Sequence, residues 1–175
     1  MVSSLDGFIA KKDNSITWME SNDQYENGME LTEEAINAFL ESIDCYVMGS
    51  RTYEQALQLG WPYGEKPVYV LTSRDLPKER ANVQFYSGDL APFLNKQLRS
   101  RHKNIWIVGG SMLTKELIRQ QFVDEIVVSI LPILLGDGLL FFDFIGHECS
   151  LHLKTVNTYK DGMVELTYSI KTDRE

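Results

Sequence analysis

Short apolar runs bounded by turn residues recur along the chain, a pattern typical of buried β-strands. Five of them read CYVMG, PVYVLTS, VQFYS, NIWIVGG and DEIVVSILPIL, at residues 45–49, 67–73, 83–87, 104–110 and 124–134. Two longer stretches, residues 151–159 and 163–171, are joined by Lys-Asp-Gly. This short join predicts that the last two strands pair as an antiparallel hairpin.

Between the strands, apolar residues recur at the three- and four-residue spacing of helices. The first such stretch, residues 31–43, has Thr32 as a candidate N-cap and two glutamates in its first turn. Three further helices are predicted at residues 51–59, 89–101 and 111–122. Strands separated by single helices need crossover connections. The pattern therefore predicts one mixed α/β domain over residues 1–175, with a mostly parallel sheet and helices on both faces.

Composition narrows the class of protein. The chain has 175 residues, 43% hydrophobic and 24% charged, which suits a soluble domain with a sizeable core. Its longest apolar stretch, residues 130–142, is interrupted by Pro132 and by Gly-Asp-Gly, so we expect no membrane span. The net charge of −8, with lysine and arginine scattered, argues against a nucleic-acid partner.

Three further features indicate the cellular compartment and whether a metal ion is bound. Cys45 and Cys149 lie among apolar residues and are predicted to be free thiols of a reducing compartment. The first residues lack the basic segment of a signal peptide, so we expect a cytoplasmic protein. The three histidines show no metal-ligand spacing, and no metal is predicted.

Three predicted strand ends carry residues that suit anions. Gly49 is followed by Ser-Arg-Thr, a second strand ends in Thr-Ser-Arg at residues 72–74, and a third ends in Gly109-Gly110 before a helix. Ligands of parallel sheets bind beyond the carboxyl ends of the strands, and helix N-termini suit phosphate. Arg74 with the two hydroxyls could hold a phosphate monoester such as the 2′-phosphate of NADPH.

Together these strand ends favour a dinucleotide laid across one edge of the sheet. The alternative for each is an ordinary tight turn, helix cap or polar loop without a ligand. The usual dinucleotide fingerprint, G-x-G-x-x-G, is absent, and so is the P-loop motif. A dinucleotide would therefore need a different fold.

Five stretches in order resemble the dihydrofolate reductase-like superfamily. They read SSLDGFIA, MGSRTYE, VLTSR, IWIVGGSMLTKELI and SILPILLGDGLLFF, and span residues 3–142. The chain is most similar to the branch that includes the C-terminal reductase domain of the bifunctional riboflavin-biosynthesis deaminase/reductase. The resemblance implies a three-layer α/β/α fold, a mostly parallel central sheet with the C-terminal antiparallel hairpin, and NADPH as cofactor.

The resemblance also implies positions for the cofactor. In this superfamily the peptide bond between the paired glycines is often cis, which is uncommon for a residue other than proline. Ile9 and Ala10 are expected beside the nicotinamide carboxamide. The phosphates and riboses are expected along the three strand ends, at Gly49, Ser50, Arg51, Thr52, Leu71, Thr72, Ser73, Arg74, Val108, Gly109, Gly110, Ser111, Met112 and Leu113.

Two acids are candidates for proton donation or substrate orientation. Asp6 lies in SLDGFIA, close to the expected nicotinamide contacts, and Glu33 lies in the helix that precedes MGSRTYE. The alternatives are a turn residue before Gly7 and an exposed acid favoured by the helix dipole. Trp18 and Phe39 are expected to border the substrate pocket.

The chain departs from the riboflavin enzymes in three ways. Val108 stands where similar reductases carry a glutamate before the paired glycines, and the deaminase motifs H-x-E and P-C-x-x-C are absent. Only Met1 and Val2 precede Ser3, so we expect that the chain lacks its true beginning, the alternative being a short central strand.

The resulting interpretation is an NADPH-dependent reductase of a pterin, folate or aminopyrimidine. The alternative is a non-catalytic NADPH-binding protein on the same fold. The small-molecule substrate itself cannot be named from the sequence. Much apolar surface in residues 129–144 favours a homodimer.

Overall fold

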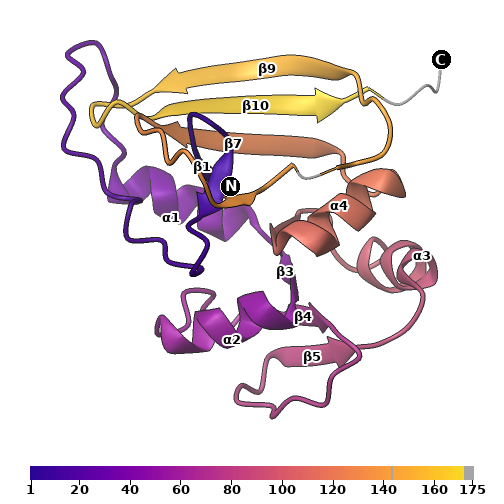
Figure 1. Cartoon of the computed structure of the whole chain (residues 1–175). Helices are drawn as coiled ribbons and strands as arrows, with labels where there is room; N and C mark the ends of the chain where they lie inside the picture. The colour runs from indigo at the N-terminus through magenta and orange to yellow at the C-terminus, as the bar shows by residue number, and fades with distance from the viewer. Residues whose placement is uncertain (143, 172–175) are drawn as a thin grey trace. The chain divides into compact units, whose positions relative to one another are not determined.

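The computed structural model in Figure 1 describes residues 1–142 and 144–171. It divides into two compact units, one of residues Glu34–Glu116 and one of Met1–Glu33 with Leu117–Glu175. Within the described residues, no helix is long and apolar enough to cross a membrane.

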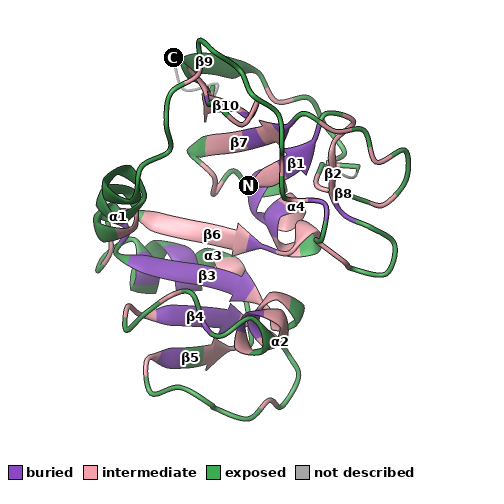
Figure 2. Cartoon of the chain, turned by 90° about the vertical axis from the view of Figure 1, so that its left-hand side faces the viewer, coloured by how far each residue is buried: buried purple, intermediate pink, exposed green. Residues whose placement is uncertain are grey.

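The unit of residues 34–116 contains the predicted parallel sheet. Its strands follow the order β5-β4-β3-β6, and every neighbouring pair is parallel. Figure 2 shows β3 and β4 as the most buried strands of this sheet. The strands occupy four of the predicted ranges: β3 (Cys45–Gly49), β4 (Val68–Leu71), β5 (Val83–Tyr86) and β6 (Ile105–Gly109).

Helices cover both faces of this sheet, as predicted. On one face, Tyr53 and Ala56 of α2 (Ser50–Gln58) share an apolar core with strand residues such as Met48. The helix α1 (Glu33–Ser42) reaches the same face, where Phe39 contacts Trp106 edge to face at 5.1 Å. On the other face, the ring of Phe93 lies 5.7 Å from that of Tyr69.

The helix expected at residues 89–101 differs in its winding. It consists of one short α-helical piece, α3 (Leu90–Pro92), followed by a π-helical segment, η1 (Phe93–Leu98). The N–H of Arg99 accordingly donates to the carbonyl of Leu94, five residues back. The predicted apolar face is nevertheless correct, because Phe93, Leu94 and Leu98 are buried.

The other unit, termed the terminal unit, is built on a second sheet, the terminal sheet, of order β1-β7-β10-β9. Its strands are β1 (Val2–Ser4), β7 (Glu125–Leu131), β9 (Leu151–Thr158) and β10 (Val164–Ile170). The strand β1 is parallel to β7, and β10 is antiparallel to both β7 and β9. The predicted C-terminal hairpin is therefore confirmed.

Two very short strands of this unit were not predicted. They are β2 (Phe8–Ala10) and β8 (Leu139–Leu140), which pair antiparallel as a small sheet of their own. The remaining helix, α4 (Ser111–Arg119), runs from one unit into the other.

Both cysteines are free thiols, as predicted. Cys45 lies fully buried in β3, and burial raises the pKa of its thiol to about 12. The thiol is therefore protonated at neutral pH and behaves as a small apolar group of the core.

Candidate functional site

The parallel sheet brings the three anion-suited strand ends to one edge. Gly49 of β3 pairs with Leu71 of β4, and Met48 pairs with Gly109 of β6. Since all these strands run in the same direction, the loops that follow them leave the sheet side by side. The residues expected from separate parts of the sequence are thus neighbours within one unit.

The two glycine turns approach each other closely. A Cβ atom added at Gly49 would lie 4.0 Å from the backbone nitrogen of Gly110, and one added at Gly110 would lie 3.7 Å from Oγ1 of Thr52. The expected cis peptide bond between Gly109 and Gly110 is present. Gly109 has a φ of +124°, in the region that favours glycine. The starts of α2 and α4 therefore lie side by side, with the Thr52 side chain next to Gly110.

The first turn of α2 is open to an anion. Its N-cap is Gly49, which carries no side chain to bond the free N–H groups, and the turn contains no acidic residue. Arg51 is exposed, while Ser50 and Thr52 are partly exposed. Positive charge and free N–H groups thus coincide at one helix start.

The loop after β4 is held by its own hydroxyl and by α2. Oγ1 of Thr72 accepts a hydrogen bond of 3.0 Å from the backbone N–H of Arg74. The guanidinium of Arg74 donates from Nη1 and Nη2 to the two carboxylate oxygens of Glu54, at 2.8 and 2.6 Å. Ser73 is exposed beside this pair. The predicted 2′-phosphate ligand Arg74 thus already has a carboxylate partner.

The start of α4 adds partly open side chains to this edge. Met112 is 79% exposed, whereas Val108, Ser111 and Leu113 are half-buried. A methionine that extends so far from the surface offers a flexible apolar contact to a planar ligand.

In the terminal unit, both carboxylate oxygens of Asp6 accept hydrogen bonds. Its Oδ1 accepts from the Ser4 hydroxyl at 2.6 Å and from the N–H of Leu135 at 3.1 Å, and its Oδ2 accepts from the N–H of Gly136 at 2.7 Å. The bond from Ser4 and then those from the backbone lower the pKa of Asp6 below its ordinary value of 3.8. This carboxylate is therefore ionised at neutral pH and ties β1 to the loop after β7.

The two residues expected beside the nicotinamide lie just beyond this network. Ile9 and Ala10 belong to β2, and Ala10 is buried against Gly138 of the loop before β8. A Cβ atom at Gly138 would lie only 2.3 Å from the carbonyl oxygen of Ala10. The backbone at Ala10 is thus fixed by a close approach that only glycine permits.

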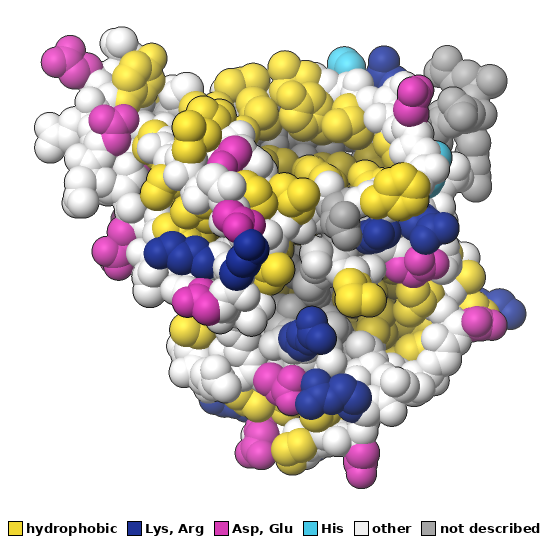
Figure 3. Space-filling model, viewed as in Figure 1, with side chains coloured by type: hydrophobic (Ala, Val, Ile, Leu, Met, Phe, Trp, Pro, Cys, Tyr) yellow, Lys and Arg dark blue, Asp and Glu magenta, His cyan; other side chains and the backbone are white. Residues whose placement is uncertain are grey.

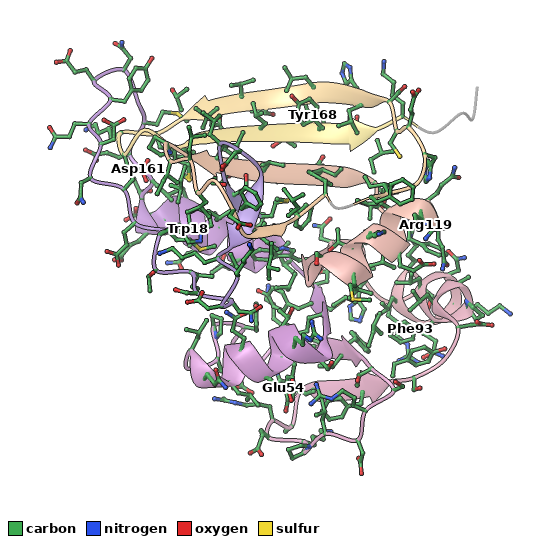
Figure 4. The ribbon with its side chains drawn as sticks, in the orientation of Figure 1. Trp18, Glu54, Phe93, Arg119, Asp161 and Tyr168 are labelled. Atoms are coloured by element: carbon green, nitrogen blue, oxygen red, sulfur yellow. The ribbon has the colours of Figure 1, made fainter. Side chains whose placement is uncertain are left out.

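Trp18 lines a pocket of about 520 Å³ that lies wholly in the terminal unit. Its side chain is 5% exposed, and within the described residues its indole Nε1 has no hydrogen-bond partner. Ser21 ties this loop to the hairpin by a bond of 2.6 Å to the carbonyl of Asp161, in the region where Figure 4 labels Trp18 and Asp161. The other lining residues are Glu20, Ser21, Asn22, Asp23, Leu131, Pro132 and Ile133.

Glu33 and Phe39 are separate from that pocket lining. Glu33 is the first residue of α1 and is exposed. Phe39 is 47% exposed, and its ring packs edge to face against that of Trp106. Within residues 1–142 and 144–171, no three His, Cys, Asp or Glu side chains gather in a way that could hold a metal ion.

Comparison with known proteins identifies the family. A sequence profile described as the RibD C-terminal domain matches residues 1–165. The chain belongs to the RibD C-terminal domain family. Among curated proteins it is similar to the uncharacterized protein YwjB of Bacillus subtilis (strain 168), with 30% identity over 168 residues, 94% of this chain and 92% of the relative.

Solved structures agree with the RibD C-terminal assignment. A putative riboflavin biosynthesis protein from Shewanella sp. PV-4 matches with a TM-score of 0.84 and 25% identity, over 98% of this chain and 97% of that one. A dihydrofolate reductase from Enterococcus faecalis, complexed with NADP(H), matches with a TM-score of 0.59 and 16% identity, over 98% and 94%. The fold is therefore dihydrofolate reductase-like, as the sequence motifs indicated.

Two residues of this RibD C-terminal domain were not singled out from the sequence. Helical spacing is the signal for Glu54, which lies in MGSRTYE three residues after Arg51 and so on the same side of α2. The signal for Ser4 is its place two residues before Asp6, since a serine hydroxyl commonly bonds a polar group so near in the chain.

Proposed function

We propose that the protein is an NADPH-dependent reductase of a pterin, folate or aminopyrimidine substrate, with residues 1–175 acting as one reductase domain. The observation that carries this proposal is the meeting of three anion-suited loops at one sheet edge, after Gly49, Leu71 and Gly109. The reductase-like fold and the similarity to a dihydrofolate reductase complexed with NADP(H) support the same cofactor.

In this proposal each loop takes one part of the cofactor. The N–H groups and hydroxyls at the start of α2 would bind the diphosphate, together with Arg51. Gly110 and the start of α4 would pass along the diphosphate and the nicotinamide ribose, where a side chain at Gly110 would intrude. Thr72, Ser73 and Arg74 would bind the 2′-phosphate, and Ile9 and Ala10 would lie beside the carboxamide.

The substrate would then meet the terminal unit. The N–H of Trp18 is buried and has no partner within the described residues, which supports its assignment to the substrate pocket, where it would donate to a substrate oxygen or ring nitrogen. Asp6 would orient the reacting groups rather than give up a proton, because its three hydrogen bonds keep it ionised. Glu33 is exposed and would have to supply or relay the proton if a side chain does so.

A non-catalytic NADPH-binding protein is the second candidate. One observation favours it: Asp6, the acid of the SLDGFIA motif, is fully engaged in bonds within its own unit. In that case the same loops would bind the cofactor, but no group would be set to transfer a proton.

Two measurements test the proposal and separate the candidates. Titration with NADPH and NADH, followed by the quenching of protein fluorescence, should show tighter binding of NADPH. NADPH oxidation would then be followed at 340 nm with dihydrofolate, dihydropterin and aminopyrimidine substrates. If NADPH binds but none of these substrates oxidises it, the second candidate is favoured. Equal affinity for NADPH and NADH would contradict the assignment of Thr72, Ser73 and Arg74.

A homodimer is part of the proposal. On one face of the terminal sheet, Val156 of β9 pairs with Leu166 of β10, which pairs with Val128 of β7. Leu151, Leu153 and Val156 are 39%, 46% and 52% exposed, and Figure 3 shows hydrophobic side chains gathered over these strands. In residues 129–144, Leu134, Phe142 and Phe144 are also exposed, while Asp143 lies outside the described residues. Apolar area of this kind is typical of subunit interfaces.

A further inference from the structure

Arg74 is engaged by Glu54 in the two-pronged geometry that a phosphate would use. Nη1 of Arg74 donates to Oε2 of Glu54 at 2.8 Å, and Nη2 donates to Oε1 at 2.6 Å. Parallel bonds from one guanidinium to two oxygens of one group are also how arginine recognises phosphate. The carboxylate of Glu54, labelled on α2 in Figure 4, therefore occupies the guanidinium fork in place of such a ligand.

Glu54 also offsets the positive charge of Arg74 and Arg51. The hydrogen bonds from Arg74 hold the pKa of Glu54 below its ordinary range, and the charges of Arg74 and Arg51 act in the same direction. Glu54 is therefore ionised at neutral pH and faces two arginines that the proposed function gives to cofactor phosphates. An incoming 2′-phosphate would meet a carboxylate beside its arginine.

The pair is open to solvent, so exchange of partners is feasible. The side chains of Arg74 and Glu54 are 52% and 39% exposed. Exposed ion pairs contribute little to stability, because water solvates the separated charges well. A phosphate could therefore displace Glu54 from the fork, or share the guanidinium through Nε, without unfolding any element.

We propose that Glu54 is a specificity-determining residue that competes with the 2′-phosphate for the guanidinium of Arg74 and so limits the preference for NADPH over NADH. This inference rests on the proposed function, because it assumes that Arg74 meets the 2′-phosphate. It adds that the chain carries its own competitor for that ligand, three residues after Arg51 on the same helix.

The test uses two probes that differ only at the 2′ position. Adenosine 2′,5′-bisphosphate and adenosine 5′-monophosphate would be titrated calorimetrically into the unmutated protein and into Glu54→Gln. Glutamine keeps the length of the side chain and removes its charge. The bisphosphate should bind about threefold to fivefold more tightly to Glu54→Gln, the factor that corresponds to one exposed ion pair. Binding of the monophosphate should change by less than about twofold.

Three further variants decide whether competition for the fork is the cause. In the Arg74→Ala background, Glu54→Gln should no longer improve binding of the bisphosphate, since no fork remains to compete for. Glu79→Gln, which removes an equal charge from another exposed position of the same unit, should leave both affinities unchanged. Circular dichroism of each variant verifies folding, which is expected because both paired side chains are exposed.

The outcomes separate this inference from the proposed function. If neither the unmutated protein nor Glu54→Gln binds the bisphosphate more tightly than the monophosphate, both are wrong. If the unmutated protein prefers the bisphosphate but Glu54→Gln leaves binding unchanged or weakens it, only the competition is wrong. A gain that persists without Arg74, or that Glu79→Gln reproduces, would show a general charge effect and would also overturn it.

Discussion

The hydroxyl of Ser4 donates to Oδ1 of Asp6 across 2.6 Å, and the same carboxylate receives two backbone N–H groups from the loop after β7. Ser4 is 1% exposed and also accepts the N–H of Phe8 at 3.0 Å. One carboxylate thereby connects β1, the turn before β2 and residues 135–136. Its ionisation is coupled to the stability of this part of the chain.

We expect Asp6→Asn to lower the melting temperature in a pH-dependent way. Because the bonds from Ser4, Gly136 and Leu135 favour the ionised form, the pKa of Asp6 in the folded protein lies below the value of 3.8 expected on unfolding. A depressed carboxyl pKa stabilises the fold above the unfolded value, and the contribution is lost as the pH falls through the folded value. The difference in melting temperature should therefore be full at pH 7 and pH 5.5, and should shrink below about pH 4.

The matched control for this prediction is Asp75→Asn. Asp75 is an exposed acid of the other unit, and its replacement should change the melting temperature little at any of these pH values. A difference for Asp6→Asn that stays constant down to pH 3 would show that packing, not ionisation, is responsible.

The periodic parts of the fold could be predicted from the sequence, because a helix or strand with one apolar side repeats its apolar residues at its own period. Strands β3, β4, β5, β6 and β7 lie within the predicted ranges, as do the two strands of the hairpin and all the helices apart from a residue at the start of α2. The pair β2 and β8 has three and two residues, too few for any period to appear. Leu90, Phe93, Leu94 and Leu98 fit the spacing of an α-helix, so the sequence gives no signal for the π-helical winding at Phe93–Leu98.

Part of the site could also be predicted from the sequence. The carboxyl ends of parallel strands meet at one edge of a sheet, so the strand order and direction suffice to predict that the three strand ends are neighbours. The partners of Asp6 at Leu135 and Gly136 are about 130 positions away along the chain, and nothing local to Asp6 indicates them. Glu54 could have been paired with Arg51 by helical spacing, but its actual partner, Arg74, lies on the next strand's loop.

Two neighbouring glycines give a second prediction, about the loop before β8. Gly136 and Gly138 both have positive φ, +73° and +154°, but only Gly138 is crowded. A Cβ atom at Gly138 would lie 2.3 Å from the Ala10 carbonyl oxygen, whereas one at Gly136 would have nothing within 4 Å. Gly136→Ala should therefore cost about 1 kcal/mol of unfolding free energy from its backbone conformation, and Gly138→Ala more than about 2 kcal/mol.

Urea unfolding of both variants measures this difference directly. The slope of the transition should be the same for the two, so that the midpoints report stability alone. Equal midpoints for Gly136→Ala and Gly138→Ala would contradict the close approach of the loop to β2.

The paired glycines give a third prediction, which separates folding from cofactor binding. A Cβ atom at Gly110 would make only an ordinary contact, 3.7 Å from Oγ1 of Thr52, so Gly110→Ala should fold and melt within a few degrees of the unmutated protein. In the proposed complex the same methyl group would stand between the starts of α2 and α4, where the diphosphate is expected. NADPH affinity should then fall at least about tenfold, as for the loss of one charge-assisted hydrogen bond or more.

Fluorescence titration with NADPH and a thermal melt of the same sample test this together. Thr114→Ser serves as the control, since it alters a buried hydroxyl-bearing residue one turn further along α4 without filling that space. A folded Gly110→Ala variant that binds NADPH normally would return the glycine pair to the role of an ordinary strand-to-helix turn.

The fourth prediction concerns the proposed homodimer. Val156 and Thr155 are adjacent on β9, and their side chains point to opposite faces of the sheet, because Val156 pairs with Leu166 and Thr155 with Thr167. In a two-fold dimer built on the apolar face, each Val156 would be desolvated near the partner copy, and a charge there would have no counter-charge. Val156→Glu should therefore convert the dimer to a monomer, while Thr155→Glu should leave it a dimer.

Size-exclusion chromatography with light scattering gives the molar mass of each variant. An unmutated chain that runs at the 20.1 kDa of one copy would refute the dimer. Dissociation by Thr155→Glu instead of Val156→Glu would place the interface on the other face of the sheet.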